Sequence, residues 1–262
     1  MDKKMFCFQC EQTVGCTGCT GNAGVCGKKA DTAKLQDELT GALISLAKAA
    51  DSTETISKRT GQIIIEGLFT TVTNVSFDNA AIENMIQKVR AEKERLVPDC
   101  RTEEYDLQQL WNANEDIRSL KSLILFGIRG MAAYAYHAKV LNYEDPEVNH
   151  FFCEALFKIG YEESVEALLP TVLKVGEINL RCMALLDKAN TETYGTPEPA
   201  VVTLAVEKGP FIVVTGHDLK DLQLLLEQTE GKGINIYTHG EMLPAHAYPF
   251  LKKFPHLKGN FG

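Results

Sequence analysis

The sequence predicts a multi-domain protein of the α + α/β class. An all-α N-terminal domain would be followed by the start of a Rossmann-like α/β domain with a parallel sheet. Three observations indicate this fold: helical apolar periodicity as far as residue 190, a break rich in Gly and Pro just after it, and short β-branched runs beyond the break. A chain of 262 residues with 45% apolar residues is long enough for two domains with buried cores.

The helical part divides into two sets of three segments, and this pattern predicts two three-helix bundles. The expected helices lie within residues 31–50, 53–72 and 78–97, then 115–142, 146–160 and 164–190. Asp31 or Thr32 is the expected N-cap of the first helix, since short polar side chains favour that position.

Residues 191–200 end the helical pattern with Gly195, Pro197 and Pro199, so we place the domain boundary between 1–198 and 199–262. Beyond it, two β-branched runs flank a helical segment, which predicts a β-α-β unit with parallel strands and a right-handed crossover. One such unit cannot cover both faces of a parallel sheet. We therefore expect an incomplete α/β domain.

The charge pattern limits the partners of this chain. The formal net charge is -8 and the acidic residues are scattered, so neither nucleic acid nor an anionic membrane is an expected partner. No apolar run is long enough for a membrane span, and the N-terminus lacks signal-peptide features. We expect a cytoplasmic protein, whose thiols stay reduced and are free to bind metal.

Five of the eight cysteines lie in the first 26 residues, and two metal-binding frameworks fit them. Cys7, Cys10, Cys16 and Cys19 have the spacing of a cramped zinc knuckle. An iron–sulfur cluster would instead suit a second set, Cys7, Cys10, Cys19 and Cys26. Glycines around the last two of these can bend the backbone and offer N–H groups to sulfur. The iron–sulfur interpretation is favoured, with zinc and reduced structural cysteines as the alternatives.

A second candidate site follows the two predicted strands. His217 comes after the first strand and Glu241 after the second, so both lie at the carboxyl edge of adjacent parallel strands. An imidazole and a carboxylate there could be two metal ligands or an acid–base pair. The simpler alternatives are that Asp218 only caps the next helix and that Glu241 is solvated.

Several strings in both regions resemble one family. "MFCFQCEQT", "TGCT", "VCGK" and "ADTAKLQDEL", followed by "GHDL" and "HGEMLPAH", are similar to the hybrid cluster protein family, also called prismane proteins or hydroxylamine reductases. The resemblance runs through the whole chain but covers only the N-terminal half of a family member. We therefore expect a truncated reading frame, a split gene or a fragment.

The resemblance also implies ligands. Cys7, Cys10, Cys19 and Cys26 would bind a [4Fe–4S] cluster, as in family members from strict anaerobes. Members with a longer gap carry [2Fe–2S], and the last spacing here matches the short form imperfectly. Cys16 would be a spare cysteine.

His217 and Glu241 would bind a hybrid [4Fe–2O–2S] cluster, whose remaining ligands lie downstream in the family. His239 and His246, which flank the glutamate, are candidates for orienting it or moving protons. Cys100, Cys153 and Cys182 match no family motif, and we expect buried structural thiols there.

The function that the resemblance implies is reduction of hydroxylamine to ammonia and water, with nitric oxide reduction or a role in nitrosative stress as further proposals. Its partners would be a small-molecule N–O substrate and a small redox protein as electron donor. Either a missing C-terminal half or a homodimer would complete the chain. The alternative is a non-catalytic iron–sulfur protein for electron transfer or redox sensing.

Overall fold

The computed structural model describes residues 5–7, 9, 18–51, 56–72, 75–98 and 104–262. The chain forms two compact units. The first comprises Met1–Tyr136 and Glu144–Met183, and the second comprises His137–Tyr143 and Ala184–Gly262. The units divide within the last long helix, whereas the sequence pattern placed the boundary after residue 198. No helix in the described ranges is long and apolar enough to cross a membrane.

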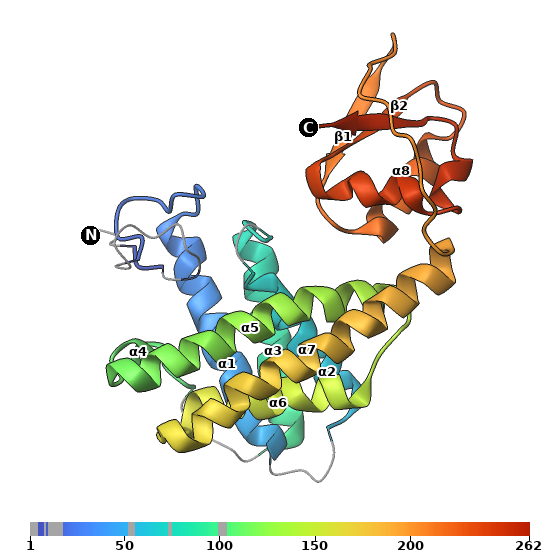
Figure 1. The fold of residues 1–262 in the computed structure, drawn as a ribbon. Helices are drawn as coiled ribbons and strands as arrows, with labels where there is room; N and C mark the ends of the chain where they lie inside the picture. The colour runs from blue at the N-terminus through green and yellow to red at the C-terminus, as the bar shows by residue number, and fades with distance from the viewer. Residues whose placement is uncertain (1–4, 8, 10–17, 52–55, 73–74, 99–103) are drawn as a thin grey trace. The chain divides into compact units, whose positions relative to one another are not determined.

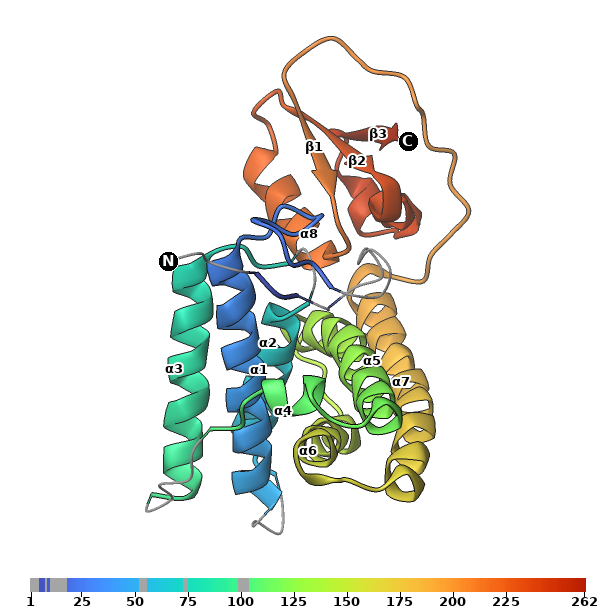
Figure 2. The same ribbon diagram turned by 90° about the vertical axis from the view of Figure 1, so that its left-hand side faces the viewer.

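Helices build the first unit, as predicted (Figures 1 and 2). They are α1 (Ala30–Asp51), α2 (Lys58–Thr70), α3 (Asn79–Leu96), the short α4 (Gln108–Trp111), α5 (Glu115–Val140), α6 (Pro146–Tyr161) and α7 (Val165–Tyr194). The ends of two of these helices, residues 137–140 of α5 and 184–194 of α7, belong to the second unit. In Figure 2 α1, α2 and α3 lie side by side. One hydrophobic core joins both sets of three helices; it includes Leu43, Ile64, Ile86, Leu125 and Phe152.

The predicted N-cap of α1 is wrong. The first helical hydrogen bond runs from Ala33 N to Lys29 O, so the helix begins before Asp31 and Thr32. Asp31 lies in the first turn, where a carboxylate interacts favourably with the helix dipole. Thr32 is used for a tertiary contact instead of a cap, since its Oγ1 donates to Asn79 Oδ1 at 2.8 Å.

A three-stranded parallel sheet forms the centre of the second unit. Its elements are β1 (Phe211–Thr215), α8 (Leu219–Thr229), β2 (Asn235–His239), the 3₁₀ helices η2 (Gly240–Ala247) and η3 (Leu251–Lys253), and β3 (Leu257–Phe261). The strand order is β1-β2-β3, and Thr215 pairs with His239 at the carboxyl ends of β1 and β2. The predicted β-α-β unit is confirmed.

The strand β3 was not predicted. It pairs with β2 on one side, and on the other a single parallel bridge joins Gly259 to Thr203. Asn260 N donates to Thr203 O at 3.1 Å. A Cβ on Gly259 would lie 2.3 Å from that same carbonyl oxygen, so only glycine permits this close approach.

Candidate metal centres

Backbone pairing brings two of the predicted cysteine ligands together. Cys7 N donates to Cys19 O at 3.0 Å, and Cys19 N donates to Cys7 O at 2.8 Å. A hydrogen-bonded antiparallel pair carries both side chains on the same face, with Cα atoms about 5.5 Å apart. Both cysteines also pack on a small apolar cluster of Met5, Ala30 and Ala33 at the start of α1. The two thiols therefore lie on the same face of the paired segments, against the start of α1.

Cys26 lies in the tight turn that follows. Gly24 N donates to Lys28 O at 2.8 Å, and Gly27 adopts a φ of 85°, which glycine tolerates without strain. The Cys26 side chain is exposed, and its Sγ lies over Gly24, 3.5 Å from the position that a Cβ there would occupy. Cys10 and Cys16 lie outside the described residues. Among the described side chains, no three His, Cys, Asp or Glu form a metal-binding group.

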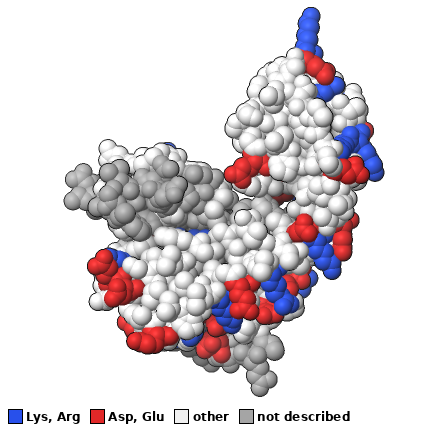
Figure 3. Space-filling model, viewed as in Figure 1, with Lys and Arg blue, Asp and Glu red and all other residues white. Residues whose placement is uncertain are grey.

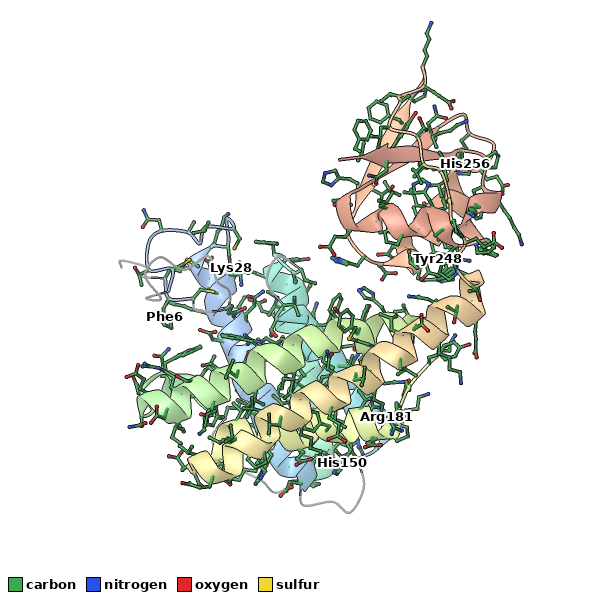
Figure 4. All side chains as sticks on the ribbon, in the orientation of Figure 1. Phe6, Lys28, His150, Arg181, Tyr248 and His256 are labelled. Carbon is green, nitrogen blue, oxygen red and sulfur yellow. The ribbon has the colours of Figure 1, made fainter. Side chains whose placement is uncertain are left out.

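Two buried cations lie beneath this loop, and sequence reasoning missed both. Lys28 is 1% exposed and donates from Nζ to Gln36 Oε1 on α1; Figure 4 shows it in the N-terminal loop. Arg129 on α5 is 5% exposed, and its Nη2 donates to Thr40 Oγ1 at 2.7 Å. Arg129 was detectable as the single charged residue in the apolar stretch 122–136.

The acidic groups beside Lys28 and Arg129 have shifted pKa values. Burial raises the pKa of Cys7, while the Lys28 charge opposes that rise. Burial also raises the pKa of Asp37 to about 6, against the attraction of Arg129 and Lys28. Arg129 Nε is buried and has no hydrogen-bond partner among the described residues.

An iron–sulfur cluster fits the chemistry of these residues. Thiolates are the soft ligands that such clusters require. Buried cations are costly unless an anion lies nearby, and a thiolate-ligated cluster would supply that anion. The unsatisfied Nε of Arg129 is consistent with such a neighbour.

The structure brings the second predicted pair into contact. His217 follows β1 and Glu241 follows β2, and His217 Nε2 meets Glu241 Oε2 beyond the carboxyl ends of the two strands. Both side chains are largely exposed, at 63% and 76%. An exposed imidazole–carboxylate pair is open to a further ligand, because neither side chain is enclosed by protein.

Asp218 has the capping role that the sequence suggested. Its carboxylate accepts from Lys220 N at 2.8 Å and from Asp221 N at 3.1 Å, at the start of α8. It also lies 3.3 Å from His137 Nδ1. The cap and the neighbouring His217–Glu241 contact coexist, so the capping interpretation does not exclude a functional one.

The two histidines that flank Glu241 are placed differently. His239 is exposed, and its Nδ1 lies 3.3 Å from Thr215 Oγ1. His246 is buried, and its Nε2 lies 2.8 Å from the hydroxyl of Thr238. Burial lowers the pKa of His246, so its ring is neutral at pH 7. These contacts suit His246 to a structural role.

The cysteines inside the helices are buried, as expected. Cys153 and Cys182 are 3% and 0% exposed, and burial raises the pKa of each thiol to about 12. Their sulfurs lie 3.6 Å from the carbonyls of Ala47 and Met131. Thiols of this kind are unreactive. Cys100 lies outside the described residues.

The chain resembles known proteins along nearly all of its length. The sequence pattern of the Prismane/CO dehydrogenase family matches residues 5–262. A protein named hydroxylamine reductase from Thermodesulfovibrio yellowstonii is 46% identical over 289 residues, which is 98% of this chain and 53% of the relative. The hydroxylamine reductase of Solidesulfovibrio magneticus is 45% identical over 288 residues, with the same two coverages.

The chain thus spans about half the length of the curated relatives that it matches, as the resemblance implied. Among solved structures, carbon monoxide dehydrogenase IV from Carboxydothermus hydrogenoformans gives a TM-score of 0.32 at 18% identity, over 99% of this chain and 43% of that one. The match over residues 5–262 and the identity to these relatives establish that the chain belongs to the Prismane/CO dehydrogenase family.

Proposed function

We propose that this chain is the N-terminal half of an iron–sulfur oxidoreductase that reduces hydroxylamine to ammonia and water. In this proposal Cys7, Cys10, Cys19 and Cys26 hold a [4Fe–4S] cluster. His217 and Glu241 are two of the ligands of a hybrid [4Fe–2O–2S] cluster, and the remaining ligands come from protein outside this sequence. Membership of an iron–sulfur oxidoreductase family and the names of its relatives support the activity.

The observation that carries the proposal is the contact between His217 Nε2 and Glu241 Oε2. A surface pair of this exposure stabilises a fold little. Its position beyond the carboxyl ends of parallel strands is where open α/β sheets bind their ligands. Two side chains are too few to hold a four-iron centre, so the pair would be one part of a shared site.

The reaction consumes two electrons and two protons for each hydroxylamine, and breaks the N–O bond. The iron–sulfur centres would supply the electrons and a Lewis-acidic binding position. The chain's own contributions are to orient His217 against Glu241 and to keep His239 exposed beside them for proton exchange. The cluster proposed at the cysteine loop would receive its electrons one at a time from a small redox protein.

We also propose the compartment in which the protein acts and the kind of partner that it binds. An exposed Cys26 beside two further thiols calls for a reducing compartment, so we assign the protein to the cytoplasm of an anaerobically growing cell. On the face shown in Figure 3, acidic and basic side chains are interspersed, which suits a protein partner better than nucleic acid. A nitrosative-stress role would follow from the same chemistry with nitric oxide.

The test is hydroxylamine-dependent oxidation of a reduced dye by the chain joined to its remaining half. We expect His217→Ala and Glu241→Ala to abolish turnover and to alter the spectrum of the hybrid cluster. His150→Ala and Glu230→Ala, which change exposed residues elsewhere, serve as matched controls and should keep full turnover. Equal turnover in all four variants would contradict the assignment of His217 and Glu241 to the catalytic centre, and a wild-type protein without turnover would favour the non-catalytic alternative.

A further inference from the structure

Lys28 and Arg129 converge on one short segment of α1. Lys28 Nζ donates to Gln36 Oε1, and Arg129 Nη2 donates to Thr40 Oγ1 one turn further along. Thr40 Oγ1 in turn donates to Gln36 O at 2.8 Å. Lys28, Gln36, Thr40 and Arg129 are all buried. The two cations therefore share one enclosed polar pocket in the helical unit.

This pocket lies against the cysteine loop. Both Lys28 and Arg129 act electrostatically on Cys7, and Lys28 Cβ lies 3.7 Å from the position that a Cβ on Gly24 would occupy, beside Cys26 Sγ. A direct contact between Phe6 and Trp111, with ring centroids 5.9 Å apart, fixes the loop against α4. The two cations are themselves held by burial and by their hydrogen bonds to α1.

The described side chains around Lys28 and Arg129 neutralise only part of their charge. Among the described residues, Asp37 is the carboxylate that interacts with both cations; burial raises its pKa to about 6, so at pH 7 it is ionised and offsets one of the two charges. The amide and hydroxyl oxygens of Gln36 and Thr40 accept hydrogen bonds but carry no charge. The pocket therefore keeps a positive charge of one or more beneath the thiols.

We propose that Lys28 and Arg129 form a pair of buried positive charges that raises the reduction potential of the cluster bound by the cysteine loop. This inference rests on the proposed cluster at Cys7, Cys10, Cys19 and Cys26. When an external reductant transfers one electron to the cluster, the cluster becomes more negative by one charge. A buried cation nearby stabilises that reduced form more than the oxidised one, since Coulomb interactions are strong away from water. Lys28 and Arg129 are positioning residues and do not touch the substrate.

The experiment is a dithionite titration of the anaerobically purified chain, followed by electron paramagnetic resonance. The variants are Lys28→Met and Arg129→Met, which remove a charge but keep most of the side-chain volume. Lys29→Met is the matched control, because Lys29 is the adjacent lysine and is exposed. Lys28→Arg and Arg129→Lys keep the charge and test rescue.

We expect both neutral variants to have a lower midpoint potential than the wild type. Lys29→Met should leave the potential unchanged, and the charge-conserving variants should recover most of the loss. A neutral variant with an intact cluster and a wild-type potential would overturn the proposal.

Failure to assemble a cluster is also informative. If the neutral variants lose the cluster while the charge-conserving variants retain it, the buried charge is required and the proposal stands. If charge-conserving and neutral variants lose it equally, side-chain shape matters and not charge, and the proposal fails. A wild-type chain without iron would instead refute the proposed function.

Discussion

His217 and Glu241, 24 residues apart in the sequence, meet side chain to side chain beyond the carboxyl ends of β1 and β2. The contact arises because the two strands are parallel neighbours in register, so residues two positions after each strand emerge at the same edge. Both side chains remain largely exposed. Such a pair is better suited to binding than to holding the fold together.

This arrangement predicts a small stability effect for the pair. Replacing His217 and Glu241 together by alanine should change the free energy of unfolding by less than about 1 kcal/mol, because exposed ion pairs contribute little. Asp218→Ala should cost about 1–2 kcal/mol, since it removes the N-cap of α8 and the contact to His137. Urea denaturation of the three proteins measures both effects. A larger loss from the double variant than from Asp218→Ala would assign a structural role to the pair.

Glu92 on α3 is the buried centre of an ion-pair network that joins α3 to α2. Its carboxylate is fully buried, with Arg59 Nε at 2.9 Å, Arg95 Nη2 at 2.7 Å and the Thr60 hydroxyl donating at 2.7 Å. Glu92→Gln should lower the free energy of unfolding by about 2 kcal/mol at pH 7. Glu94→Gln, an exposed neighbour on the same helix, is the control and should have almost no effect.

The effect of Glu92 depends on pH. The hydrogen bond from Arg95 lowers the pKa of Glu92 in the folded chain below its usual 4.5. The unfolded chain therefore binds the proton first, and the stabilisation is complete above pH 4.5 and is lost as the pH falls through the folded pKa. Denaturation midpoints of wild type and Glu92→Gln should converge in acid. A difference that persists unchanged at pH 3 would contradict this explanation.

Gly41 permits a close approach between α1 and the segment before α4. A Cβ there would lie 2.1 Å from Tyr105 O, so Gly41→Ala requires a backbone shift and should cost about 2–4 kcal/mol. Gly176 on α7 has no atom within 4 Å of its Cβ position. Gly176→Ala should therefore stabilise the chain by about 0.5–1 kcal/mol through helix propensity. Thermal unfolding of both variants should shift in opposite directions.

Thiol reactivity should separate the two classes of cysteine. Iodoacetamide added to the native iron-free chain at pH 8 should modify the exposed Cys26 and leave Cys153 and Cys182 unmodified, because burial raises the pKa of both helical thiols to about 12. Mass spectrometry of the digested chain reports each site. Loading with iron and sulfide should then protect Cys26, and a Cys26 that stays equally reactive after loading would not be a ligand.

The helices and the β-α-β unit were predictable because each carries its own apolar period. The β1 sequence "FIVVT" and the β2 sequence "NIYTH" are β-branched or aromatic runs bounded by turn residues. The strand β3 was missed because "LKGNF" contains Gly259 and Asn260, which disfavour strands. Pairing with β2 and the close approach of Thr203 override that local preference. The start of α1 was missed for a similar tertiary reason, since Thr32 bonds to Asn79.

The candidate sites were predictable where the proposed ligands themselves define the pattern. Closely spaced cysteines and the residues after two parallel strands are local signals. The buried charges were not predictable in the same way, because only the tertiary contact of Arg129 on α5 with Thr40 on α1 brings it to the segment that Lys28 contacts. Arg129 alone gave a signal, as an isolated charge in an apolar helix, but nothing local indicated that it faces the cysteine loop.

The most direct test of the account is the iron and sulfide content of the anaerobically purified 262-residue chain, measured together with its hydroxylamine turnover. We predict about four iron atoms and four sulfides per chain, and their loss in Cys7→Ser. Turnover should be negligible, because His217 and Glu241 alone are too few ligands to hold the proposed hybrid cluster. Zinc in place of iron would contradict the assignment of the cysteine loop. About eight irons with rapid hydroxylamine reduction would contradict the view that this chain carries only part of the second site.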